Sequence, residues 1–152
     1  MDKSMYSKFL LMMGCSFILM YSTMFLNVVE MNHIYISQTR IFMTFLMVAP
    51  MAIVMLLFML SMYKNKTKNA MIIGGAILVF CVSLFLLRSQ STVKDIQYMK
   101  AMIPHHSSAI LVSENAQLKD PETKKLAKDI IEAQKREIAQ MEAIIKRLEA
   151  TK

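Results

Sequence analysis

The residues best suited to chemistry lie in one short stretch, Tyr98–His106, which reads Y-M-K-A-M-I-P-H-H. At about 100° per residue in a helix, Met99, Met102 and His106 fall within one sector of roughly 60°, with His105 on its flank. Thioether sulfur and imidazole nitrogen together suit a soft metal ion such as Cu(I) or, by the same argument, Ag(I). Harder ions would require carboxylates, and this sector has none. The stretch therefore predicts a soft-metal site.

A second predicted helix provides facing side chains. If the turn centres near residues 119–120, antiparallel packing places Gln134 level with His106 and Met141 level with Met99. A glutamine on an otherwise aliphatic stripe needs a hydrogen-bond partner, and His106 is the nearest candidate. The predicted metal ligands are Met99, Met102, His105, His106 and Met141, with Gln134 in a supporting position.

Each of these features also has a purely structural interpretation. A His106–Gln134 pair would fix the helix register without a metal, and methionines are most often gap-filling core residues. Pro104 indicates either a helix start or a kink, and would also free the carbonyl of Lys100. His33 is a lone histidine in a connection, where we expect it to be solvated. Metal binding and a metal-free structural role both stay open on the residues alone.

The density of charged residues in this chain of 152 residues changes at about residue 92. Residues 1–92 contain seven Lys/Arg and two Asp/Glu, whereas residues 93–152 contain eleven and nine. With 55% hydrophobic residues and three each of Gly and Pro, collagen-like and disordered chains are excluded. We expect a membrane domain over residues 1–92 and a water-exposed domain over residues 93–152.

Three uncharged apolar runs, residues 9–29, 41–63 and 70–87, are each long enough to cross a bilayer as a helix. Lys3 and Lys8 precede the first run, and three lysines separate the second from the third. The positive-inside rule therefore places the N-terminus in the cytoplasm. Three spans then place the C-terminal domain on the opposite side, periplasmic or extracellular.

The polar part predicts a helical hairpin. Asp120 followed by proline is a helix start, and apolar positions from Leu126 to Leu148 recur at steps of four and three, which predicts a helix to about Glu149. The preceding helix spans roughly Val93–Gln117. Because a helical pair of about 60 residues is marginal alone, we expect a homodimer that forms a four-helix bundle.

Enzyme signatures are missing from the sequence. It lacks the two Glu-x-x-His motifs that di-iron helical bundles carry, any H-E-x-x-H or G-x-S-x-G motif, and a phosphate-cradling glycine loop. Residues 93–152 carry a net charge of only +2, eleven basic minus nine acidic, with alternating signs, so they lack a basic face for nucleic acid. We expect a non-enzymatic protein whose partners are the lipid membrane, a metal ion and a second copy.

Three segments together resemble a known family: M-I-P-H-H-S-S-A-I from Met102, D-P-E from Asp120, and Q-K-R-E-I-A-Q-M from Gln134. The chain is similar over about residues 93–150 to the bacterial family catalogued as "domain of unknown function 305", which includes CopM-like periplasmic copper-binding proteins. Its membrane part looks like that of membrane-anchored members, with M-V-A-P-M at Met47–Met51. The resemblance implies a ferritin-like helical bundle outside the cytoplasm, associated with copper or silver handling.

By position, the resemblance implies that Met102, His105, His106 and Met141 face the metal and that Gln134 supports them; Met99 is added from helix geometry. The predicted function is membrane-anchored, extracytoplasmic sequestration or delivery of Cu(I) or Ag(I). The alternatives are a metal-free, membrane-anchored helical interaction module and a sensor or subunit of a transport complex.

Overall fold

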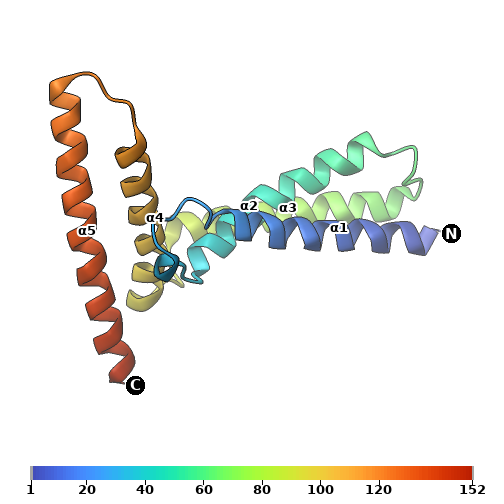
Figure 1. The fold of residues 1–152 in the computed structure, drawn as a ribbon. Helices are drawn as coiled ribbons and strands as arrows, with labels where there is room; N and C mark the ends of the chain where they lie inside the picture. Colours follow the sequence, from blue (N-terminus) through green and yellow to red (C-terminus); the bar gives the residue numbers. More distant parts are fainter. Residues whose placement is uncertain (1, 152) are drawn as a thin grey trace. The chain divides into compact units, whose positions relative to one another are not determined.

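The protein is all-helical over the part that its computed structural model describes, the backbone of residues 2–151 and the side chains of residues 5–151. Those residues form no strand. The elements are α1 (Asp2–Thr23), the 3-10 helix η1 (Met31–His33), α2 (Gln38–Phe58), α3 (Lys66–Ser89), α4 (Asp95–Asn115) and α5 (Pro121–Ala150) (Figure 1). The all-α fold class is confirmed. Two compact units result, one from residues up to 23 and 39–92, the other from residues 24–38 and from 93 onward.

The first unit contains three helices that are long and apolar enough to cross a membrane, over Met5–Thr23, Gln38–Phe58 and Lys66–Ser89. The first differs from the predicted run of residues 9–29, because the helix ends at Thr23, whose hydroxyl donates to the Met20 carbonyl. Residues 24–29, although apolar, belong to the second unit. Hydrophobicity alone therefore overestimated how far this helix extends.

Side chains of α1, of α2 and of Tyr63, which follows α2, form the core of this unit, with Ile72 and Ile73 of α3 packed against it. The buried members are Tyr6, Phe9, Met13, Val48, Ala52, Leu56 and Tyr63. A polar cluster closes one end. The Tyr6 hydroxyl donates to Asn69 Oδ1 at 2.8 Å, and Asn69 Nδ2 donates to the Tyr63 carbonyl at 2.6 Å. These bonds satisfy the buried Asn69 amide and tie the start of α1 to the start of α3.

The second unit is built on the antiparallel pair α4 and α5, as the apolar periodicity predicted. Its core contains Met99, Ile103 and Ile110 from α4 and Ile138 and Ile145 from α5. Pro104 lies inside α4, so it does not mark a helix start. Asp120 caps α5 by accepting from the backbone N–H and the hydroxyl of Thr123, at 2.7 and 2.8 Å. These hydrogen bonds lower the pKa of the Asp120 carboxyl below its usual range.

The register of α4 against α5 differs from the register predicted for a turn centred near residues 119–120. The backbone is extended at Ala116 and at Asp120, and the connection runs past the end of α4 before α5 turns back (Figure 1). The first turns of α5 are consequently little covered within the unit: Leu126 is 59% exposed and Ile130 37% exposed. These two residues begin the predicted apolar stripe of α5, but they are not part of the buried core.

Residues 24–38, the connection between α1 and α2, pack onto α4. Ser107 Oγ accepts from the Val29 amide at 2.8 Å and lies 2.9 Å from His33 Nδ1. Asn27 Nδ2 donates to Ser108 Oγ at 2.6 Å, and the Gln38 amide donates to a Gln97 side-chain oxygen at 3.0 Å. His33 is only 6% exposed. The expectation of a solvated loop histidine is wrong, because the segment that carries it docks on a helix.

Replacing Ser107 with alanine should loosen this docked segment. The change leaves the Val29 amide and a His33 ring nitrogen without their partner, which should cost about 1–3 kcal/mol because the His33 contact is buried and the Val29 contact partly buried. Chemical denaturation of the full chain measures the loss, and hydrogen exchange at the Val29 amide locates it.

Ser108→Ala is the matched control, because the Ser108–Asn27 bond lies at an exposed position. We expect it to change stability by under about 0.5 kcal/mol, as ordinary surface substitutions do. Equal losses in the two variants would contradict a specific role for Ser107.

Candidate metal-binding site

His106 lies on the inner face of α4 and has a partner at each ring nitrogen. Nδ1 lies 3.0 Å from the Met102 carbonyl oxygen one turn earlier, and Nε2 lies 2.8 Å from Glu137 Oε2 on α5. The residue is 8% exposed, while the Glu137 side chain is 46% exposed. A carbonyl and a carboxylate both accept hydrogen bonds, so both contacts are made when each ring nitrogen carries a proton.

A pocket of about 340 Å³ lies beside the contact between His106 and Glu137. Side chains from both helices line it: Tyr98, Met102 and His106 from α4, and Glu137, Gln140, Met141 and Ile144 from α5. The structure therefore brings three of the predicted metal ligands, Met102, His106 and Met141, to one cavity. Of the lining residues, Tyr98 is 54% exposed.

The other predicted site residues lie outside this pocket lining. Met99 is buried in the core of the unit, where Met141 packs against the same cluster. His105 is exposed, with its ring centroid 6.2 Å from that of His106. Adjacent residues on a helix point about 100° apart, so only one of the two histidines can lie on the inner face.

Glu137, rather than Gln134, is the partner of His106. The expected Gln134 contact is wrong because the extended connection shifts α5 along α4. Glu137 lies three residues beyond Gln134 in the same sequence motif, so the sequence contained the signal for a carboxylate here. Its position opposite His106, however, depends on the conformation of residues 116–120. In addition to the predicted set, the site therefore contains one carboxylate.

Among residues 5–151 there is no group of three His, Cys, Asp or Glu side chains arranged to hold a metal ion. A metal bound beside His106 would consequently depend on the thioethers of Met102 and Met141. Those donors favour soft ions and are poor ligands for Mg²⁺ or Ca²⁺.

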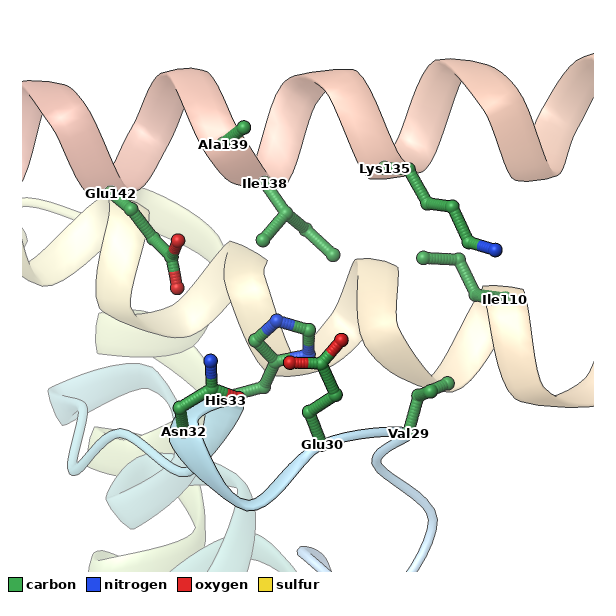
Figure 2. Close-up of a pocket in the computed structure, with 9 residues that line it drawn as sticks. All are labelled: Val29, Glu30, Asn32, His33, Ile110, Lys135, Ile138, Ala139 and Glu142. Carbon is green, nitrogen blue, oxygen red and sulfur yellow. The ribbon is translucent and has the colours of Figure 1, made fainter.

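A second pocket of about 230 Å³ lies between residues 24–38 and the hairpin. Figure 2 shows the His33 ring beneath α5, with the side chains of Glu30 and Glu142 extending into the same space. Lys135 also lines this pocket, but its ammonium pairs with Glu114 at 2.9 Å. Nearby, partial burial and the charge of Glu142 raise the pKa of Tyr35 above its usual range. This pocket has charged side chains in its lining, and it lacks the sulfur donors of the first.

No solved structure matches the chain. It is 38% identical over 142 residues to an uncharacterized protein of Acanthamoeba polyphaga mimivirus, and the alignment covers 91% of each chain. That length includes most of the apolar helices as well as the C-terminal hairpin. Neither this relative nor the family description names a metal, so the implied copper function is still an expectation. Residues 86–151 match the family described as a domain of unknown function (DUF305), and the chain belongs to that family.

Proposed function

We propose that this protein is a membrane-anchored metal-binding protein whose pocket between α4 and α5 holds Cu(I) or Ag(I) outside the cytoplasm, for sequestration or delivery. One observation carries the proposal. Met102 and Met141, which come from different helices, line the same pocket as the buried imidazole of His106. Two thioethers and an imidazole are a donor set suited to soft monovalent ions.

The orientation of His106 supports this role. When Nδ1 donates to the Met102 carbonyl, the ring is held in place and Nε2 is directed toward α5 and the pocket. Such a bond from the second ring nitrogen is the usual support of a metal-binding histidine. A metal ion would bind Nε2 in place of the contact with Glu137, and it would require that nitrogen without a proton.

Membrane anchoring rests on the three apolar helices, and the extracytoplasmic side rests on the lysines at positions 3, 8, 64, 66 and 68. The segments that make up the second unit are consistent with this membrane orientation. Residues 24–38 follow the first helix, and residues from 93 onward follow the third, so three spans place both segments on the same side of the membrane. These two segments form one compact unit.

The test is a Cu(I) titration of the full chain in detergent against a competing chromogenic chelator. We expect one tight Cu(I) per chain. His106→Gln and the double variant Met102→Leu/Met141→Leu should each weaken binding by at least the roughly 10- to 100-fold that loss of a supporting ligand contact costs. The leucines keep the apolar volume and remove the sulfur, so folding should be preserved.

His105→Gln is the matched control, because His105 is exposed and does not line the pocket. Its affinity should stay within about threefold of the wild type, well below the effect of losing a supporting contact. A chain that fails to compete with the chelator would refute the metal site. Equal losses at the two histidines would show that the ion binds elsewhere.

A metal-free, membrane-anchored interaction module is the second candidate, favoured by the two partners that His106 already has. In that role the ion pair only fixes the register of α4 and α5. Its contribution should be small, since the Glu137 side chain is 46% exposed. Glu137→Gln should therefore cost under about 1 kcal/mol without metal, and Gln134→Ala should leave the His106 ring resonances unchanged.

The two functions differ in how unfolding responds to metal. A ligand that binds only the folded state must stabilise it. We expect Cu(I) to raise the unfolding midpoint of the wild type and to leave that of His106→Gln unchanged. A wild-type midpoint that Cu(I) does not move would favour the interaction module.

We also propose that a second copy completes the bundle by covering the first turns of α5. Burying an exposed leucine or isoleucine stabilises an interface by about 1.5–3 kcal/mol. Leu126→Ser/Ile130→Ser should therefore convert a dimer in detergent to a monomer, as measured by light scattering. Val112→Ser, at a 60% exposed position on α4, is the control and should leave the dimer intact. A wild-type monomer would contradict this proposal.

A further inference from the structure

A third pocket, of about 430 Å³, lies in the membrane unit where α2 ends and α3 begins. It is lined by Leu60, Tyr63, Lys64, Lys66, Asn69, Ala70 and Ile73. Two lysines thus share a cavity with aliphatic side chains, at the end of helices that are long and apolar enough to span a bilayer. The metal proposal makes no use of these residues.

The lining changes from charged to apolar along a single stripe of α3. Lys66, Ala70 and Ile73 are spaced four and three residues apart, so they lie on one helix face. At 1.5 Å per residue, the stripe extends about 10 Å from the first turn into the apolar part of the helix. Ala70 is small and exposed, which leaves room beside the helix below the lysine.

Contacts around Tyr6 hold this end of the unit in shape. Its hydroxyl lies 3.2 Å from the Asn65 amide, which donates to it, and its ring lies 4.8 Å from Lys68 Nζ. Asn65 Oδ1 accepts from the Lys68 amide and caps α3. Residues 5–23 and 39–92 contain no Asp or Glu. The lysines of this pocket therefore have no carboxylate within those segments to neutralise them.

We propose that this pocket binds one anionic glycerophospholipid, with its phosphate between Lys64 and Lys66 and an acyl chain along Ala70 and Ile73. The polarity of the pocket lining matches that of the lipid. The negative headgroup would lie near two ammonium groups, and the hydrocarbon chain would lie along the apolar part of the same stripe. The inference rests on the membrane anchoring proposed above. The proposed orientation also places this lysine-rich end of the helices at the cytoplasmic leaflet, which is the leaflet that carries anionic lipid.

The experiment is native mass spectrometry of the full chain in detergent, with phosphatidylglycerol or phosphatidylcholine added. We expect the wild type to retain phosphatidylglycerol in preference. Each lysine near an anionic headgroup changes binding about fivefold, so Lys64→Gln/Lys66→Gln should weaken phosphatidylglycerol binding on the order of ten- to thirtyfold. Inorganic phosphate at millimolar concentration should not displace the lipid, since it lacks the acyl chain.

Lys8→Gln/Arg88→Gln is the matched control, because it removes the same charge from residues that do not line the pocket. An equal loss in this control would overturn the proposal in favour of diffuse charge attraction. Displacement by inorganic phosphate would show a free-anion site instead. Ala70→Leu should fill the apolar stripe and also weaken binding; undiminished binding in that variant would overturn the acyl position.

Folding and anchoring are checked on the same samples. Helix content and unfolding midpoint should match the wild type in every variant. Extraction of the native chain from membranes by alkaline carbonate would refute the anchoring on which the inference rests. An anchored chain that binds Cu(I) but shows no lipid preference would refute the lipid site alone.

Discussion

The packing register of α4 against α5 determines which side chains share the pocket around His106. Aliphatic burial sets this register, since Ile103, Ile110, Ile138 and Ile145 interlock in the core of the pair. The ion pairs Lys100–Glu149 and Lys135–Glu114 are exposed and contribute little by comparison. Sliding α5 by one turn would place a different residue opposite the imidazole and would separate Met102 from Met141. The chemistry of the site is therefore a consequence of how the isoleucines pack.

Local signals predicted the helices well and the contacts between them poorly. The Asp120 cap, the apolar runs and the inner face of α4 depend on residues within a few positions of one another, so periodicity and capping were sufficient. The partner of His106 depends on the path of the connection over residues 116–120, whose conformation has no comparable sequence pattern. A symmetric turn was the simplest assumption, and it placed Gln134 where Glu137 lies.

The docking of residues 24–38 could not have been predicted by the same reasoning. His33 and Ser107 are 74 positions apart, and nothing near His33 in the sequence indicates a partner. Ser107 immediately follows the two histidines, so one helix turn presents His106 to α5 and the next residue to the docked segment. The pair of adjacent histidines appeared to be a doubled metal ligand, yet their roughly 100° separation on a helix buries one and exposes the other.

A bonded His106 is compatible with a metal site because a proton and a metal ion use the same nitrogen. In the metal-free protein, Nε2 lies 2.8 Å from Glu137 Oε2, so the buried imidazole has a polar partner there. A soft ion bound with Met102 and Met141 would take that position at Nε2, and Glu137 would keep a positive neighbour. On release, the contact between Nε2 and Glu137 would form again, so neither state would leave the imidazole unpaired. The contact between His106 and Glu137 is thus also suited to reversible exchange, which the proposed delivery of an ion would require.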